Sequence, residues 1–455
     1  MTLYRPPAPF PIDPVRGLIR AMLSGERDLL SLLPDIAYST SVGPLGRSRR
    51  GIVLVNDPAT VARVLTDPDQ VFPKNDLLVG ALEALVGQSM FVSSGPQWRR
   101  QRRMIDPAFS HMRVNRSFDA IQAGVNAYNS MLDARAATGE AFSLDAAMSH
   151  LTADIICRTI FTQSLASQTA RDVFASFGEF ERHVANTEIR RLLFGKPFAK
   201  IPQNARVLAC CERIRRHIGD LLDPRLDPNA PAIDDIVGAV ISATDTETGE
   251  RFTREELIDQ IGVFFLAGHE TTASVLTWTF FILSQRPEFA DRIRSEVAEV
   301  AGSGEIRLEH TKQLVFTRRV FREAMRLYPP ITFIPRVVQQ STELAGMALK
   351  RGTMVMIAPW TIHRHPATWA DADRFNPDRF ANEADIPTGA YIPFGLGPRI
   401  CVGAAFATIE STLILARLTR DYDFTPLEPG RVRPVARLTT KPASEITCRV
   451  RRRAA

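Results

Sequence analysis

The chain has 455 residues, of which 45% are hydrophobic and 23% are charged. This composition is that of an ordinary globular protein, and it excludes disordered and collagen-like chains. The formal net charge of +6 comes mostly from arginine and is modest for this length. It therefore favours acidic protein partners and argues against binding of nucleic acid.

The sequence predicts neither export nor a membrane anchor. Residues 1–14 are rich in proline and lack the apolar core of a secretory signal. The most apolar stretch, residues 273–283, is far shorter than the roughly 20 residues that cross a bilayer. The cysteines show no pairing pattern, which favours a reducing compartment, so the predicted location is the cytoplasm. They are Cys157, Cys210, Cys211, Cys401 and Cys448.

Helical spacing of apolar residues dominates the chain after a first expected strand within residues 51–58. Stretches rich in Pro and Gly at 71–96 and 223–232 are expected to be loops. The helices predicted from apolar residues at three- and four-residue spacing cover 58–65, 98–109, 114–136, 144–161 and 205–222.

The best-defined predicted element is a long helix over residues 253–284. It begins with Thr253-Arg254-Glu255-Glu256, which has the pattern of a capping box. A further helix is expected over 312–327, where Pro329-Pro330 prevents its continuation. Strands are expected at 334–338 and 353–357. The long irregular stretch at 361–400 is predicted to be functional, because such stretches are uncommon in compact domains.

The strongest motif is Phe394-Gly395-Leu396-Gly397-Pro398-Arg399-Ile400-Cys401-Val402-Gly403, followed by a helical pattern over 404–417. It resembles the cysteine loop of the cytochrome P450 family, Phe-x-x-Gly-x-Arg-x-Cys-x-Gly, at every fixed position. Its glycines allow positive φ and close approach to a flat macrocycle. The position of Cys401 ahead of a helix N-terminus favours the thiolate. A structural cysteine in a glycine-rich turn is the alternative, which the ten-residue match disfavours.

The resemblance implies roles for the residues of this loop. Cys401 would be the thiolate ligand of the haem iron, a ligation that in this family favours O–O cleavage. Arg399 would pair with a haem propionate, and Phe394 would shield the sulfur. Gly395 and Gly403 would contact the cofactor. A separate pair, at positions 363 and 365, consists of histidines that we interpret as loop hydrogen-bonding residues, because one iron needs only one protein ligand here.

A second motif combines Glu323 and Arg326, which share one helix face. Downstream, Pro377-Asp378-Arg379-Phe380 lies where the P450 family supplies a second arginine. The resemblance implies that Glu323, Arg326 and Arg379 lock the loop beneath the haem and have no catalytic role. The alternative is an exposed ion pair worth a few tenths of a kcal/mol.

A third motif lies inside the long helix, at Ala267-Gly268-His269-Glu270-Thr271-Thr272. Glycine and polar residues are locally unfavourable in mid-helix, and such choices in a buried element often mark function. The segment resembles the oxygen-binding stretch of the P450 family. The resemblance implies that Ala267 and Gly268 border the cofactor, while Glu270 and Thr271 organise water and deliver protons. His269 receives no role, and a buried polar patch is the alternative.

Weaker matches lie elsewhere in the chain. Trp98 and Arg102 resemble the family's Trp-x-x-x-Arg, which holds a propionate, and Arg336 lies where another propionate-binding arginine is frequent. Neighbouring basic residues are interpreted either as a docking surface for a redox partner or as an ordinary basic helix surface. These residues are Arg99, Arg100 and Arg103.

The resemblance spans about residues 50–430 and implies the P450 fold, which is mainly α-helical with a smaller β-rich part. Residues 1–455 would form a single haem domain with residues 1–50 as a lead-in. Haem b would lie between the 253–284 helix and the 394–403 loop. The implied reaction inserts one atom of O2 into a small apolar substrate and releases the other as water. Electrons would come from NAD(P)H through a reductase and a ferredoxin or flavodoxin.

The sequence leaves the substrate open among fatty acids, terpenoids or steroids, and aromatic compounds. Arg190 or Arg191 could meet a carboxylate-bearing substrate. One alternative function is a peroxygenase or isomerase, against which the intact Glu270-Thr271 pair argues. The other is a non-catalytic haem protein for electron transfer or sensing, which would need no apolar pocket. The expected pocket residues are Phe72, Phe91, Phe264, Ile331 and Phe333.

Overall fold

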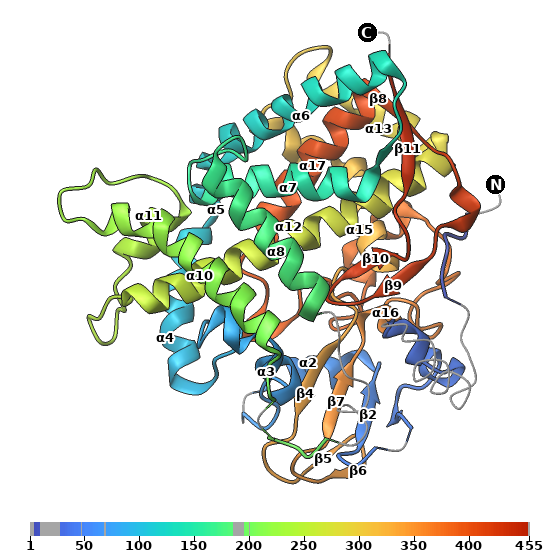
Figure 1. The fold of residues 1–455 in the computed structure, drawn as a ribbon. Helices are drawn as coiled ribbons and strands as arrows, with labels where there is room; N and C mark the ends of the chain where they lie inside the picture. Colours follow the sequence, from blue (N-terminus) through green and yellow to red (C-terminus); the bar gives the residue numbers. More distant parts are fainter. Residues whose placement is uncertain are drawn as a thin grey trace.

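The computed structural model describes residues 4–9, 28–46, 48–67, 70–184, 195–199 and 201–453. Helices form most of the molecule, and a smaller set of strands gathers mainly at its periphery (Figure 1). This confirms the predicted class, mainly α with a smaller β-rich part. The helices are α2 (Pro58–Thr66), α3 (Asp76–Val86), α4 (Gly95–Ile105), α5 (His111–Arg116), α6 (Phe118–Thr138), α7 (Leu144–Ile160), α8 (Gln168–Val184), α10 (Ala205–Leu226), α11 (Ile236–Ser242), α12 (Arg254–Gln285), α13 (Pro287–Ala301), α14 (Leu308–Gln313), α15 (Val315–Leu327), α16 (Pro359–Ile362) and α17 (Ala404–Asp421).

The predicted helices are present, but the one predicted over 98–109 is α-helical only to Ile105, with a 3-10 turn over Asp106–Phe109, and two others are divided. The helix predicted over 114–136 is split between α5 and α6 at Ser117, whose hydroxyl donates back to the Arg113 carbonyl at 3.2 Å. The helix predicted over 312–327 is split between α14 and α15. There the carboxylate of Glu296, on α13, accepts hydrogen bonds from backbone N–H groups at the start of α15.

The prediction of a loop over 71–96 is wrong in part, because helix α3 lies inside this range. The side chain of Asn75 accepts from Leu77 N at 2.9 Å and caps this helix, so one internal glycine, Gly80, does not break it. The loop predicted over 223–232 is also partly wrong, since α10 continues through Pro224 to Leu226. A proline in the last turn removes only one hydrogen bond of the helix ladder.

Two main sheets cover opposite ends of the helical part. One has the strand order β1-β2-β7-β4, with β2 and β7 parallel and the other neighbours antiparallel. The other has the order β3-β11-β8 and is antiparallel. The strands predicted near 51–58, 334–338 and 353–357 are β2, β4 and β7. The strands are β1 (Val42–Pro44), β2 (Ile52–Val55), β3 (Phe142–Ser143), β4 (Ile334–Val337), β5 (Thr342–Leu344), β6 (Met347–Leu349), β7 (Met354–Ile357), β8 (Tyr422–Pro426), β9 (Pro434–Ala436), β10 (Thr440–Pro442) and β11 (Thr447–Arg452).

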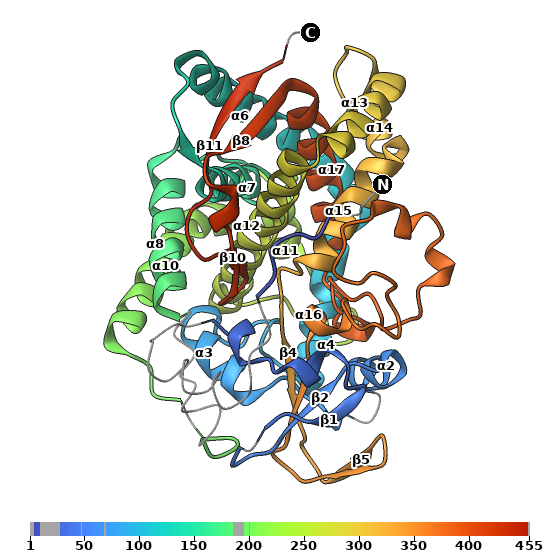
Figure 2. The same cartoon turned by 90° about the vertical axis from the view of Figure 1, so that its right-hand side faces the viewer.

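Helix α12 crosses the centre of the molecule, with α7, α8 and α10 on one side and α15 and α17 on the other (Figure 2). Its 32 residues span roughly 48 Å. The predicted capping box is present: Glu256 N donates to Thr253 Oγ1 at 3.2 Å, and Thr253 N donates to Glu256 Oε2 at 2.8 Å. The predicted helix over 253–284 is therefore confirmed. It is buried along nearly its whole length, as expected for a central helix.

The segment 361–400 is irregular, as predicted, apart from the end of α16 and short 3-10 turns. It lies beside α15 at the right of Figure 2 and leads directly into α17. Its last part is the loop that contains Cys401. The fold thus brings this loop to the N-terminus of a helix that packs against α12.

Candidate functional site

The loop before α17 has a closed and specific backbone conformation. Cys401 N donates to Phe394 O at 2.9 Å, and Ile400 N donates to Gly397 O at 3.0 Å. Gly395 and Gly397 have φ of 77° and 73°, values that L side chains rarely adopt. A Cβ on Gly397 would also lie 2.8 Å from Leu65 O, at the end of α2. Glycine is therefore required at 397 for both reasons.

Cys401 is an exposed residue, unlike the other four cysteines, which are buried. Burial raises the pKa of the Cys401 thiol, while the Gly403 amide and the Arg102 guanidinium oppose this rise. An N–H donor and a nearby cation are the features that stabilise a thiolate.

The central helix has accessible surface in its middle. Ala267 is exposed and Gly268 and Thr271 are half-buried, although the helix is otherwise largely buried around them. Thr271 Oγ1 donates to Ala267 O at 2.6 Å. The role of Gly268 at the cofactor stays a prediction, but the structure shows a second constraint on this residue, because a Cβ there would lie 2.5 Å from Ile156 Cδ1 of α7. This glycine is needed for close packing of α12 on α7.

Cations gather around the 394–403 loop. The Arg399 guanidinium lies 4.4 Å from the centre of the Trp98 ring, and Arg399 Nη2 donates to Ser93 O at 2.9 Å. Arg399 Nη1 is buried and has no hydrogen-bond partner in the described part of the chain. Arg336 is also buried, and this burial lowers its pKa to about 10. Lys74 pairs with Arg336 through a backbone bridge.

The cationic cluster of Lys74, Arg336 and Arg399 fits a ligand that carries carboxylates. Burial and then repulsion from both arginines hold the pKa of Lys74 well below its usual range. Asp67 is a carboxylate that acts on both arginines. One carboxylate does not balance three cations, of which Arg336 is buried and the other two are half-buried, and cations removed from water need anionic partners. Two haem propionates would supply them. Sequence reasoning missed Lys74, because no local motif marks this residue.

Arg102, predicted to hold a propionate, has contacts with the protein through two of its nitrogens, and its role toward a propionate stays a prediction. Its Nη1 donates to Ile400 O at 2.7 Å, and its Nε lies 2.6 Å from Asp106 Oδ1. This side chain therefore supports the backbone directly before Cys401.

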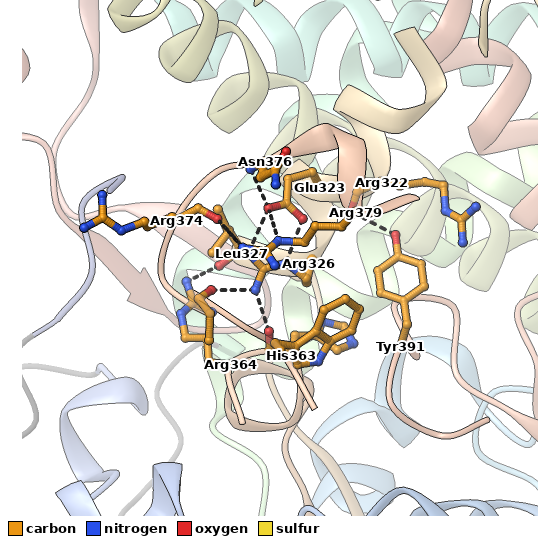
Figure 3. A network of polar contacts seen from close by, with 12 residues as sticks. Arg322, Glu323, Arg326, Leu327, His363, Arg364, Arg374, Asn376, Arg379 and Tyr391 are labelled. Carbon is orange, nitrogen blue, oxygen red and sulfur yellow. Dashed lines mark hydrogen bonds and ion pairs between the residues drawn. The ribbon is translucent and has the colours of Figure 1, made fainter. Parts of the chain in front are cut away.

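Glu323, Arg326 and Arg379 form one ion-paired cluster (Figure 3). Arg326 donates from Nε and Nη2 to the two carboxylate oxygens of Glu323 at 2.7 and 2.8 Å. Arg379 Nε donates to Glu323 Oε1 at 3.1 Å. The side chains of Glu323 and Arg326 are 0% exposed, so the alternative of an exposed helix-surface pair is wrong.

The same cluster holds the irregular segment through its backbone. Arg326 donates to the carbonyls of His363, Ala372 and Arg374, and Arg379 donates to those of residues 370 and 371. His363 Nε2 accepts from Ile392 N at 2.9 Å, as expected for a loop hydrogen-bonding residue. Burial, reinforced by two arginines, lowers the pKa of His363 to about 3, so this ring is neutral.

The predicted pocket residues lie in different environments. Phe72 packs in the core against the β1-β2-β7-β4 sheet, and Phe264 packs edge-on against Phe109 with ring centres 5.1 Å apart. Phe91 lies under Lys74 Nζ, 3.9 Å from the ring centre. The other two, Ile331 and Phe333, are half-buried. The positions of Arg190 and Arg191 lie outside the described residues.

The basic residues of α4 are not equivalent. Arg100 pairs with Glu256 at 2.7 Å, and Arg103 pairs with Asp245 at 2.9 Å. Arg99 is exposed and has no ion pair within the described ranges. Arg99 is therefore the residue of the three whose charge is not compensated by a carboxylate of the described part of the chain, and the docking surface stays a prediction.

Comparison with known proteins assigns the family. The model of the family "Cytochrome P450" matches residues 42–448. Cyclooctat-9-en-7-ol 5-monooxygenase of Streptomyces melanosporofaciens is 30% identical over 92% of this chain and 89% of its own. Pentalenene oxygenase of Streptomyces avermitilis is 29% identical over 84% of both chains. A cytokinin hydroxylase of Arabidopsis thaliana is 30% identical over 84% of this chain and 75% of its own. The crystal structure of the cytochrome P450DA haem domain has a TM-score of 0.80 at 23% identity, covering 100% of this chain and 99% of that one.

This chain belongs to the cytochrome P450 family. It is accordingly an enzyme, a haem-thiolate monooxygenase, as the sequence predicts. The family implies a haem iron with a cysteine thiolate ligand and O2 as co-substrate, and its members generally use redox partners. Within the ranges that the structure describes, none of the helices has the length and apolar content needed to span a membrane.

Proposed function

We propose that this monooxygenase hydroxylates an apolar, terpenoid-like substrate at a haem b whose iron is bound by Cys401. The observation that carries the proposed site is the accessible Cys401 residue in the closed 394–403 loop, whose Arg399 belongs to one cationic cluster with Lys74 and Arg336. The substrate class is supported by relatives whose names denote an unsaturated alcohol and an alkene. Phe91, Ile331 and Phe333 supply apolar surface at the expected pocket positions.

The residues around the proposed haem have separate tasks. When bound, haem supplies the chemistry that activates O2. Arg399 offers its unpartnered Nη1 to a propionate, with Trp98 holding the guanidinium plane. Arg336 and Lys74 would neutralise the remaining charge of the two haem propionates. The cluster of Glu323, Arg326 and Arg379 fixes the loop from outside and touches no reacting atom.

Thr271 and Glu270 are the proposed proton-handling residues. The Thr271 hydroxyl is half-buried and donates to Ala267 O, so its oxygen retains acceptor capacity for water. Glu270 is buried at the preceding helix position and is ion-paired with Lys441. Together they can hold a water molecule and pass protons toward the accessible middle of α12.

A reconstitution experiment tests the proposed function. With NAD(P)H, a ferredoxin and its reductase, the enzyme is expected to consume O2 and hydroxylate cyclic terpene hydrocarbons, which also produce a type I shift of the Soret band. In a Thr271→Ala variant, product per NAD(P)H should fall on the order of tenfold or more, because a positioned proton donor contributes at least this much. Turnover with peroxide alone would indicate a peroxygenase. Haem binding with neither spectral shift nor product across fatty acids, terpenes and aromatics would indicate a non-catalytic haem protein.

We also propose that the redox partner is an acidic ferredoxin or flavodoxin that docks at Arg99. The contact between Arg102 and Ile400 joins α4 to the 394–403 loop, and Ile400 is 42% exposed, so this surface lies over Cys401. Arg99→Glu should slow reduction by about tenfold at low ionic strength, with a smaller effect as salt increases. Stopped-flow reduction measures this rate. Lys350→Glu, the same charge change after β6, is the control, and an unchanged rate in Arg99→Glu would exclude docking there.

A further inference from the structure

A buried group of charged and polar side chains joins α8, α12 and β10. Lys441 Nζ is ion-paired with Glu270 and lies 3.4 Å from Glu181 Oε2. His269 Nε2 lies 3.5 Å from Glu181 Oε1. The carboxylate side chains of Glu181 and Glu270 are 11% and 4% exposed. Residues from three separate elements therefore meet at the acid of the oxygen-binding stretch.

The balance of charge in this group requires a shared proton. His269 Nδ1 lies 2.9 Å from Phe265 O, and because a carbonyl oxygen only accepts, Nδ1 carries the proton and Nε2 is an acceptor. Burial lowers the pKa of His269, so the ring is neutral. One lysine then faces two buried carboxyl groups, and both cannot remain charged without a large desolvation penalty. Burial and the nearby Glu270 raise the pKa of Glu181 well above its usual range, which favours the protonated form of Glu181.

Lys441 is held in place by its neighbours. The carbonyl of Thr440 accepts from Ser274 Oγ at 2.6 Å and from Trp278 Nε1 at 3.2 Å, both on α12. Thr440 N donates to Pro330 O at 3.0 Å. These contacts fix β10 against the turn of α12 that follows Glu270. The Lys441 side chain is 37% exposed, so the group also reaches solvent.

We propose that Glu181 is the proton donor that reprotonates Glu270, and that Lys441 is the positioning residue that holds the two carboxyl groups together. In this step the O–H bond of Glu181 breaks and an O–H bond forms on the Glu270 carboxylate, with no change in electron count. Glu181 then regains a proton from solvent water at the exposed side of Lys441. Glu181 Oε1 and Glu270 Oε2 have no hydrogen-bond partner among the described residues, and Lys441 Nζ contacts both carboxyl groups. The inference rests on the proposed function of Glu270.

Infrared spectroscopy of the haem-bound enzyme tests the protonation of Glu181 without turnover. Glu181→Gln is expected to remove one carbonyl stretching band of a protonated carboxyl group, a band that shifts in D2O. Glu410→Gln should remove a different band, because burial also raises the pKa of Glu410, which is fully buried on α17. Glu179→Gln, at an exposed pair with Arg213 on the same helix as Glu181, should remove none. An unchanged spectrum in Glu181→Gln would overturn the proposal.

Coupling and its pH dependence test the transfer. Product per NAD(P)H should be highest below the raised pKa of Glu181 and fall as pH rises through it, because only the protonated acid donates. In Glu181→Gln this ratio should fall roughly tenfold, lose that pH dependence and show a larger solvent isotope effect. Lys441→Met should lower the product formed per NAD(P)H, whereas Lys441→Arg, which keeps the positive charge, should leave this ratio near that of the wild-type enzyme. Unchanged coupling in Glu181→Gln, with an active wild-type enzyme, would overturn this inference alone. A wild-type enzyme with no turnover would instead contradict the proposed function.

Discussion

A Cys401→Ser variant is expected to lose the red-shifted Soret band of the reduced CO complex and to form no product above background. A serine hydroxyl has nearly the shape of the thiol but lacks the polarisable thiolate that donates electron density to the iron. The backbone of the loop should remain, because Cys401 N still donates to Phe394 O. The CO difference spectrum measures the loss, and circular dichroism checks that the fold is retained.

Cys157→Ser is the matched control for this variant. Cys157 is a buried thiol on α7, and burial raises its pKa to about 12, so it remains a neutral thiol. The control should keep the red-shifted band even if it lowers stability. A Cys401→Ser protein with the band intact would contradict the proposed iron ligand.

The second large effect is expected from Glu323→Gln. The substitution removes the negative charge from a fully buried carboxylate that pairs with Arg326 and Arg379. Arg326 would remain buried with its charge uncompensated, and breaking such a pair lowers the free energy of unfolding by about 3–5 kcal/mol. Denaturant unfolding of the haem-bound protein measures this change, and haem release should become faster.

Glu309→Gln provides the comparison for the buried cluster. Glu309 pairs with Arg307 at the surface, where both side chains are more than half exposed. Its replacement should change the free energy of unfolding by no more than about 0.5 kcal/mol. An equally small effect of Glu323→Gln would show that the 361–380 segment is held by other contacts.

The sequence predicted those parts of the site that lie in contiguous motifs. The loop at 394–403 and the capping box at Thr253 depend on residues a few positions apart, so local chemistry determines them. The Glu323-Arg326 spacing likewise placed both side chains on one face of α15. Arg379 could be added only through the family resemblance, because its contact with Glu323 joins positions far apart in sequence.

The unpredicted features depend on contacts between distant segments. Lys74 meets Arg336 and Arg399 only after the sheet has formed, and Lys441 reaches Glu270 only when β10 packs on α12. His269 received no role, although its neutral ring contacts Glu181. Similarly, the division between α14 and α15 is supported by Glu296 from another helix. A pattern of local spacing contains none of this information.

The close approach of Gly397 to Leu65 O has a consequence for protein engineering. The end of α2 and the loop containing Cys401 share one surface, although they are far apart in the chain. Mutant libraries that reshape the end of α2 would therefore also disturb the cofactor loop, whereas diversity placed at Ile331 and Phe333 would avoid this contact. Directed evolution of substrate choice should accordingly leave residues 65–66 unchanged and vary the segment before β4.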